Sequence, residues 1–366
     1  MNIVHTEASC GWGGQEIRIL EESRGLIERG HEVVVLCPPQ ARIFAEAPRR
    51  GVPAVALPIG RKNLRGLFAL RRWLRNHPAD VVNTHSSTDT WLAALACASL
   101  RHAPPLVRTR HISAAVPDNA ASRWLYARAV RHVVTTGEAL RRQLIERVGV
   151  PAERVTSVPT GIDTECFSPV SSAADKAAAK TALGLDQNKI HIGIVATLRS
   201  WKGHLYLLDA FAQLQRPDLQ LVIVGEGPMR EPITEKIAAL GLGDRVTLAG
   251  QRTDPERWLQ AMDVFCLPSY ANEGVPQAIL QAMLCALPIV TTPVGSILEA
   301  VSDGETALVV PPKDATALAA AISRLLDDPA LAAHLGDHAR RVASADFSKD
   351  TMLDRMETLF RQARSS

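Results

Sequence analysis

Two basic side chains follow a strand-like run in the second half of the sequence. The run IVATL ends at residue 198, and Arg199 and Lys202 come before Gly203 and a helical pattern. Ligands of α/β proteins bind beyond the carboxyl ends of parallel strands, where two such cations would neutralise a phosphate group. A solvated basic loop is the simpler alternative for these residues taken alone.

An acidic residue stands just before a second helical pattern in the same half. The strand-like VFCLP leads to Glu273, and Gly274, Val275 and Pro276 then open the helix. Proline suits a first helical turn, and the free N–H groups of a helix start attract anions. A carboxylate beside them would accept hydrogen bonds from sugar hydroxyls. The alternative is an ordinary helix start with an exposed glutamate.

Glycines and histidines are the corresponding candidates in the first half. Gly13 and Gly14 open a helix after the first strand-like run, where they would cradle a phosphate. The loop lacks G-x-G-x-x-G spacing and the second run ends at Cys37 without an acid, which disfavours a nicotinamide dehydrogenase. His85 and His111 each follow a strand end. Two histidines at equivalent ends of one sheet suggest a site, although a structural role is the alternative.

The elements that must position these residues alternate between strand and helix along the chain. Such alternation is typical of parallel sheets covered by helices. The strand-like runs are 2–7, 32–37, 54–59, 79–85, 105–111, 132–137, 191–198, 219–225, 245–250, 264–268, 288–292 and 307–312. We predict an N-terminal domain over 1–170, a second domain over 171–345 and a C-terminal helix over 346–366. The apolar stripe of that helix comprises Met352, Leu353, Met356, Leu359 and Phe360.

The composition agrees with two globular domains in 366 residues. Six dispersed cysteines without a C-x-x-C pair argue against a zinc site and against a secreted disulfide framework. The N-terminus does not resemble a signal peptide. The uncharged stretch 274–298 contains three prolines, so it is expected to form a helix and a strand rather than a membrane span. We therefore expect a cytoplasmic protein.

Positive charge is concentrated in the first half. Residues 1–170 carry a net charge of +7 and the remainder −4. Between residues 51 and 142 there are 14 basic residues against four acidic ones, densest in RKNLRGLFALRRWLRN. This pattern favours reversible docking on an anionic membrane, with a solvated basic face as the alternative. Nucleic acid is disfavoured because the arginines are not interleaved with aromatic residues.

Several segments, in their order and spacing, resemble the retaining nucleotide-sugar glycosyltransferases of family four. Those enzymes have the α/β GT-B fold, in which two Rossmann-like domains face a cleft, and the resemblance implies that the C-terminal helix crosses back to the first domain. The resemblance covers nearly the whole chain. It rests on ERGHEVVVL, ADVVNTHS, VPTGIDTECFSP, ATLRSWKG, VIVGEGP, DVFCLPSYANEGVPQAILQAM and GSILEAVSDGETALVVPPKD.

The resemblance implies catalytic roles for three residues. Lys202 would bind the donor diphosphate together with the helix start, Glu273 would hold the transferred sugar, and His111 would lie near the reacting centre. The residues expected to bind substrate are Gly13, Gly14, His85, Thr197, Arg199, Gly225, Glu226, Gly274, Val275, Pro276 and Gln281. Two of them depart from the family pattern. Gln281 replaces the second acid of E-x7-E, and Thr197 replaces the usual arginine partner of the lysine.

The expected reaction is transfer of a sugar from a UDP- or GDP-sugar to a saccharide or glycolipid, in lipopolysaccharide or another cell-envelope glycan. The sequence has no D-x-D motif, so we expect neither a metal nor a cofactor and assign the leaving diphosphate to protein groups. No carboxylate pair presents itself as nucleophile and acid, which favours front-face substitution with retention. The alternatives are a catalytically weakened GT-B binding protein and a nucleotide-sugar epimerase of the same fold.

Overall fold

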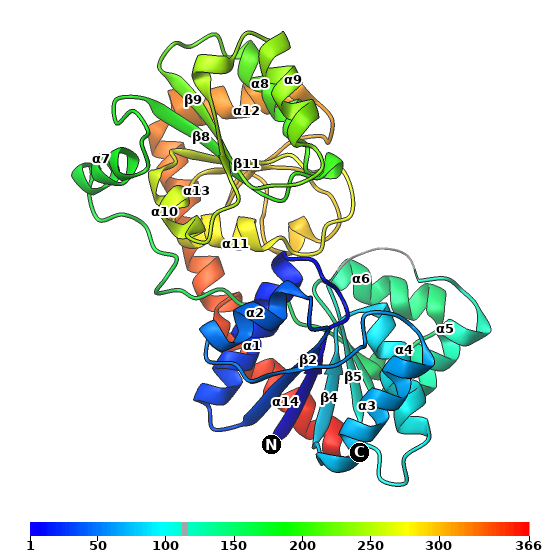
Figure 1. Cartoon of the computed structure of the whole chain (residues 1–366). Helices are drawn as coiled ribbons and strands as arrows, with labels where there is room; N and C mark the ends of the chain where they lie inside the picture. Colours follow the sequence, from blue (N-terminus) through cyan, green and yellow to red (C-terminus); the bar gives the residue numbers. More distant parts are fainter. Residues whose placement is uncertain (112–115, 366) are drawn as a thin grey trace. The chain divides into compact units, whose positions relative to one another are not determined.

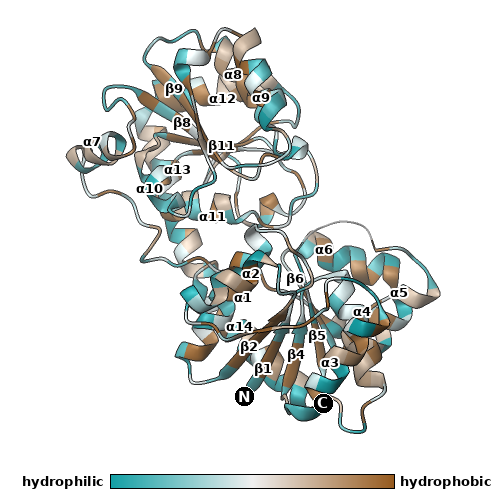
Figure 2. Cartoon of the chain, in the orientation of Figure 1, coloured by the Kyte–Doolittle hydropathy of each residue, from teal (hydrophilic) through white to brown (hydrophobic). Residues whose placement is uncertain are grey.

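The computed structural model describes residues 1–111 and 116–365 and divides the chain into two compact units (Figure 1). Unit 1 comprises Met1–Gly161 with Lys349–Ser366, and unit 2 comprises Ile162–Ser348. Each unit is built on one parallel sheet covered by helices, which confirms the predicted α/β class. The apolar residues of each sheet lie between the helical layers (Figure 2).

Unit 1 contains a seven-stranded sheet in the order β3-β2-β1-β4-β5-β6-β7. Its strands are β1 (Asn2–Thr6), β2 (Glu32–Cys37), β3 (Ala54–Ala56), β4 (Val81–Thr84), β5 (Leu106–Arg110), β6 (His132–Thr135) and β7 (Val155–Ser157). Among the described residues, each strand pairs with its neighbours in parallel. Six of these strands fall within the predicted runs. The edge strand β7 was not predicted, because its three residues include a single apolar side chain.

The helices of unit 1 cover both faces of its sheet. They are α1 (Gly14–Glu28), α2 (Arg42–Arg49), α3 (Leu64–Asn76), α4 (Ser87–Ala98), α5 (Ala120–Trp124), α6 (Glu138–Gln143) and α14 (Lys349–Ser365). α5 and α6 continue into π-helical turns at Leu125–Ala129 and Leu144–Val148. α3 packs on α4, whereas α14 packs on α1 and against β4 and β5.

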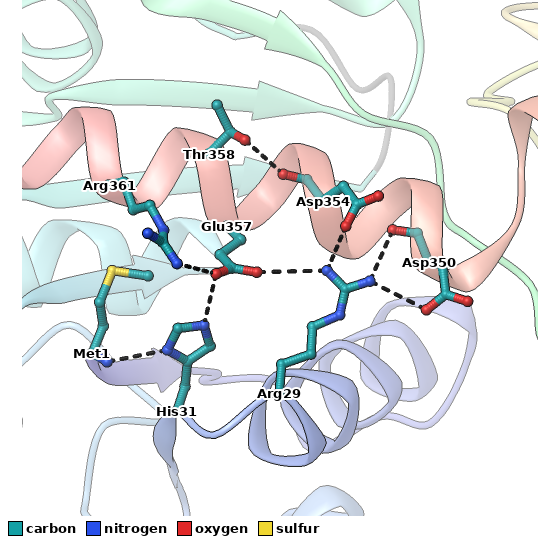
Figure 3. Close-up of polar contacts among 8 residues, drawn as sticks. All are labelled: Met1, Arg29, His31, Asp350, Asp354, Glu357, Thr358 and Arg361. Carbon is teal, nitrogen blue, oxygen red and sulfur yellow. Dashed lines mark hydrogen bonds and ion pairs between the residues drawn. The ribbon is translucent and has the colours of Figure 1, made fainter.

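The C-terminal helix α14 belongs to unit 1 because its apolar stripe is buried there. The five predicted stripe residues are all buried in one cluster with strand residues of the unit 1 sheet. Charged contacts flank this stripe (Figure 3). Arg29 lies 2.6 Å from Asp354 and 3.2 Å from Asp350, and His31 lies 3.2 Å from Glu357. The last helix is therefore an integral layer of the first unit.

Unit 2 contains a six-stranded sheet in the order β10-β9-β8-β11-β12-β13. Its strands are β8 (Ile190–Val195), β9 (Leu219–Val224), β10 (Val246–Gly250), β11 (Val264–Leu267), β12 (Ile289–Thr291) and β13 (Leu308–Val309). Its helices are α7 (Ala173–Ala182), α8 (His204–Gln213), α9 (Arg230–Ala239), α10 (Pro255–Ala261), α11 (Gln277–Leu284), α12 (Ala315–Asp327) and α13 (Pro329–Asp346). Within the described ranges, no helix is long and apolar enough to span a membrane.

Candidate functional site

The candidate residues gather where the strand order of each sheet reverses. In unit 2 the chain runs outward from β8 to β10 on one side and from β11 to β13 on the other. The connections after β8 and β11 therefore leave the sheet in opposite directions and open a crevice at its carboxyl edge. Lys202 follows β8 and Glu273 follows β11. In unit 1 the reversal lies between β1 and β4, where His5 and His85 stand.

Lys202 and Glu273 form an ion pair in which the ammonium contacts both carboxylate oxygens, at the point where the strand order of the unit 2 sheet reverses. Nζ of Lys202 lies 2.7 Å from Oε1 of Glu273 and 3.0 Å from Oε2. The hydroxyl of Ser269 also donates to Oε1 at 2.7 Å. The lysine side chain is 18% exposed and the glutamate 5%. A partly buried charge pair is costly to desolvate and keeps its geometry only when such extra hydrogen bonds support it.

Two glycines bring the loops that carry this ion pair together. Gly203 has φ of 79°, and a Cβ on it would lie 2.0 Å from the carbonyl oxygen of Pro268 at the end of β11. Gly295 has φ of 62°, and a Cβ there would lie 2.0 Å from the carbonyl oxygen of Glu273. Only glycine fits such close backbone approaches at positive φ. The loops after β8, β11 and β12 are thus locked side by side.

The other predicted residues after β8 and β9 surround this edge but do not join the ion pair. Thr197 and Arg199 are exposed in the loop after β8. Gly225 has φ of 150°, and a Cβ on it would meet the backbone at the end of β8. Glu226 is half-exposed, and its carboxylate lies 3.0 Å from Arg230. These positions remain candidate substrate contacts.

The helix start predicted after Glu273 begins slightly later in the structure. α11 begins at Gln277, with Pro276 in the extended capping position. Val275 and Pro276 are buried and Gly274 is half-buried. Gln281 is half-buried on the second turn, and its side-chain amide makes no hydrogen bond with any described residue. The segment thus presents backbone rather than apolar side chains at the sheet edge.

Unit 1 brings together the two predicted histidines and a third that sequence reasoning missed. Nδ1 of His85 lies 2.9 Å from Nε2 of His111, and Nε2 of His85 lies 2.8 Å from Nδ1 of His5. Burial and the nearby Arg18 lower the pKa of His5 to about 3. Burial, followed by neighbouring cations and imidazoles, also lowers the pKa of His85 and His111 well below the usual range. All three rings are therefore neutral at pH 7.

Buried charges around the histidines were also not predicted. Arg18 is fully buried in α1, where it lies 3.5 Å from Glu22 and donates to the carbonyl of Val158 at 2.8 Å. Arg108 in β5 is 5% exposed, and its Nε and Nη1 find no hydrogen-bond acceptor among the described residues. Buried cations with unused donors favour an anionic or oxygen-rich ligand nearby. Helical and strand patterns hide such residues, because they occupy positions where apolar side chains are expected.

The predicted Gly13 and Gly14 stand at the start of α1, beside a buried acid. α1 begins at Gly14, and Gly13 precedes it in an extended conformation. Glu7, at the end of β1, accepts hydrogen bonds from the backbone N–H of Ser9 and from the side chain of Gln15. Burial, and secondly the charge of Asp89, raises the pKa of Glu7 to about 8. A largely protonated carboxyl group thus braces the glycine loop at pH 7.

A cavity of about 590 Å³ lies elsewhere in unit 1, at the amino ends of β5 and β6. Leu106 and Arg131 mark those strand ends in its lining. The histidines stand at the carboxyl ends of β4 and β5, so this cavity is not part of the candidate site. The candidate residues of each unit lie at the carboxyl edge of that unit's own sheet.

Comparison with known proteins identifies the family. The profile described as "Glycosyltransferase Family 4" matches residues 12–166, and that described as "Glycosyl transferases group 1" matches residues 175–342. A D-inositol 3-phosphate glycosyltransferase of Acidothermus cellulolyticus is 30% identical over 92% of this chain and 84% of its own length. This chain belongs to the GT-B glycosyltransferases. The predicted family is thereby confirmed at that level.

Other relatives of this glycosyltransferase match over shorter spans. The alpha-D-kanosaminyltransferase of Streptomyces kanamyceticus is 30% identical over 66% of this chain and 64% of its own length. The lipopolysaccharide core biosynthesis mannosyltransferase LpsB of Rhizobium meliloti is 36% identical over 49% and 52%. A structural comparison covers nearly the whole chain. The solved structure of Anabaena Alr3699/HepE in complex with UDP superposes with a TM-score of 0.86 at 22% identity, covering 99% of this chain and all of that one. This superposition shows that the two chains share a fold.

Proposed function

We propose that this glycosyltransferase moves a sugar, with retention of anomeric configuration, from a UDP- or GDP-sugar to a hydroxyl of a saccharide or glycolipid in cell-envelope glycan synthesis. The observation that carries the proposal is the Lys202–Glu273 pair at the reversal of the unit 2 sheet. The UDP complex of HepE supports a nucleotide-sugar donor, and LpsB supports an envelope-glycan acceptor. The acceptors named for other relatives differ, so the identity of the acceptor is the least constrained part of the proposal.

The charges of the site suit departure of a nucleoside diphosphate. The ammonium of Lys202 neutralises a phosphate oxygen, and the positive end of the α11 dipole adds to it. We assign this neutralisation to protein groups rather than to a divalent cation. Glu273 then accepts hydrogen bonds from hydroxyls of the transferred sugar, as its buried carboxylate is fixed by Ser269.

Retention follows if both substrates react on one face of the sugar. The acceptor oxygen forms a bond to the anomeric carbon while the bond from that carbon to the phosphate oxygen breaks. The acceptor's proton passes to the departing phosphate, which therefore serves as the base. No enzyme carboxylate has to act as nucleophile in this step, and the carboxylate of Glu273 is already paired with Lys202.

The acceptor surface is proposed to face an anionic membrane. α3 exposes Leu64 and Phe68, one turn apart, at 68% and 61% of their surface. Exposed arginines at 61, 65, 72 and 75 surround them, while the guanidinium of Arg71 turns back to donate to Ser99 at 2.8 Å. Exposed cations beside two apolar side chains suit reversible docking on anionic lipid, and they support the proposal that the enzyme works at the inner face of the cytoplasmic membrane.

The test is product analysis with a panel of nucleotide sugars. We expect mass spectrometry of envelope-glycolipid extracts, incubated with the purified chain and each donor, to show addition of one sugar from a UDP- or GDP-sugar. NMR of the product should show the anomeric configuration of the donor. Inversion would refute the front-face mechanism, and binding of a donor with neither hydrolysis nor transfer would favour the weakened binding protein.

A further inference from the structure

The three histidines of unit 1 form a hydrogen-bonded row that leads toward the carboxyl edge of the sheet. β4 lies between β1 and β5, with His5 opposite Asn83 and Asn83 opposite Val107. His85 therefore stands two residues beyond the level of His5, and His111 two residues beyond the level of His85. The row leads from the fully buried His5 to the half-buried His111 at the edge.

The number of protons in this row limits it to two arrangements. A neutral imidazole carries one proton, so one nitrogen donates and the other accepts. His85 uses both nitrogens, with His5 on one side and His111 on the other. Either every Nδ1 carries the proton and His111 offers an N–H at Nδ1, or every Nε2 carries it and His111 offers a lone pair there. The second arrangement also buries an N–H at Nε2 of His5.

The surroundings of His5 favour the first arrangement. Its Nε2 is buried and has no hydrogen-bond partner among the described residues. A buried N–H group that finds no acceptor costs more than a buried lone pair that finds no donor, so this nitrogen is expected to carry the lone pair. The charged groups that act on the row from neighbouring elements are Arg18 on all three rings, Arg108 on the rings of His85 and His111, and Asp89 on the backbone N–H of His85.

We propose that His5 and His85 are positioning residues that hold His111 in a single tautomer and present its Nδ1–H to a substrate oxygen. Nδ1 of His111 makes no hydrogen bond with any residue that the structure describes, so it is available. The backbone N–H of His85 donates to Asp89 at 2.9 Å, which fixes the middle of the row. The inference rests on the proposed function, since that function places the substrate at this edge. His111 is then a hydrogen-bond donor and not a general base.

Position 5 offers a pair of variants with side chains of the same shape that differ in hydrogen-bond polarity and in charge. The side chains of His5→Asn and His5→Asp have the same shape, but only the amide can donate to Nε2 of His85. The aspartate accepts a hydrogen bond from an N–H at Nε2 of His85, which reverses the row and leaves His111 with a lone pair at Nδ1. We expect His5→Asp to lower kcat about 10²-fold with little change in donor KM, and His5→Asn to stay within about fivefold of wild type.

Nitrogen-15 NMR of the histidine rings tests the tautomer independently of activity. We expect His111 to carry its proton on Nδ1 in the wild type and on Nε2 in His5→Asp. His132→Gln is the control, because His132 lies in the neighbouring β6 and contacts Thr156 instead of the row. It should leave the tautomer of His111 unchanged.

Three results would overturn the inference. They are a wild-type His111 protonated on Nε2, equal losses of kcat in both position 5 variants, and no loss in either. If His5→Asp fails to fold, the wild-type spectrum still decides. A folded wild type with the expected tautomer but no glycosyl transfer would refute the proposed function and leave the tautomer assignment standing.

Discussion

At the scale of single residues, Lys202 and Glu273 neutralise each other in the structure. Under the proposed function, a diphosphate would compete for the ammonium of Lys202, because two phosphate groups offer more negative charge than one carboxylate. Glu273 would then have lone pairs free for sugar hydroxyls while Ser269 holds it at 2.7 Å. The proposal therefore couples arrival of the diphosphate to recognition of the sugar.

Glu273→Gln and Gln281→Ala separate recognition of the sugar from recognition of the nucleotide. Glu273→Gln should lower kcat about 10²-fold, because an amide accepts weaker hydrogen bonds from the sugar than a carboxylate does. Free-nucleotide affinity should change little. Gln281→Ala should weaken nucleotide binding and transfer together by about tenfold, the loss of one hydrogen bond. Titration calorimetry and initial rates measure both quantities. Equal, small effects from the two substitutions would contradict the assignment.

Sequence reasoning named single residues of the candidate site but did not predict the contacts between them. Lys202 and Glu273 were both predicted, because strand-end loops and a glycine follow a recognisable pattern. Their ion pair depends on β8 and β11 lying side by side, which the pattern of one chain segment does not reveal. His5 was missed because it lies within an apolar run. Arg18 was missed because a helical arginine is normally expected to face solvent.

At the scale of elements, the contact between α1 and α14 sets the stability of unit 1. A Cβ on Gly25 would lie 2.4 Å from Cδ1 of Leu353. Gly25→Ala should therefore destabilise by about 1–3 kcal/mol through overpacking, although alanine is the better helix former. Leu353→Ala should cost about 2–5 kcal/mol. The double variant should cost clearly less than the sum in urea unfolding, and strict additivity would contradict this packing.

Helix α3 is the element expected to contact lipid. Vesicles with anionic lipid should sediment the protein at low salt, and binding should fade as salt rises, because exposed cations supply about 1 kcal/mol each. Arg65→Glu with Arg72→Glu should abolish binding. Arg71→Ala is the matched control, since its guanidinium is engaged by Ser99. Equal binding to neutral vesicles, or none to anionic ones, would refute the docking proposal.

Most helices and strands were predictable from the periodicity of apolar residues. The elements that were not predicted were missed for physical reasons that can be named. The buried parallel strands are apolar runs in the sequence, and loop residues and glycines mark where each run begins and ends. β7 was missed because Val155–Ser157 is short and polar at the sheet edge. The π-helical turns after α5 and α6 have no simple sequence signature. The apolar stripe of α14 was predicted, but the surface that buries it required the tertiary structure.

At the scale of the whole molecule, buried neutral histidines make the fold sensitive to acid. Burial lowers the pKa of His5 to about 3 and of His204 to about 4, and it lowers those of His85 and His111 as well. Below pH 6.5 the unfolded chain binds protons that the folded chain does not. Each such histidine then costs up to about 1.4 kcal/mol per pH unit. Thermal unfolding midpoints should therefore fall from pH 7 to pH 5, and a constant midpoint would contradict the burial.

Glu7 has the opposite dependence on pH. Its pKa is raised to about 8, so its contribution to stability is complete below about pH 4.5 and is lost as pH rises through 8. Glu7→Gln keeps an uncharged side chain of the same shape and removes this opposing contribution. The variant should lose stability more steeply on acidification than the wild type does. A shallower loss in the variant would mean that Glu7 is ionised at pH 7.

The central claim is that Lys202 supplies the positive charge for diphosphate departure. Its most direct test is the rate of sugar transfer by wild type, Lys202→Ala and Lys236→Ala, each measured with EDTA. Lys236 is the matched control, because it forms a 2.7 Å ion pair with Asp209 in the same unit. We predict full activity with EDTA for the wild type and Lys236→Ala, and a loss of about 10²–10³-fold for a folded Lys202→Ala. Abolition of wild-type transfer by EDTA, or an active Lys202→Ala, would contradict the account.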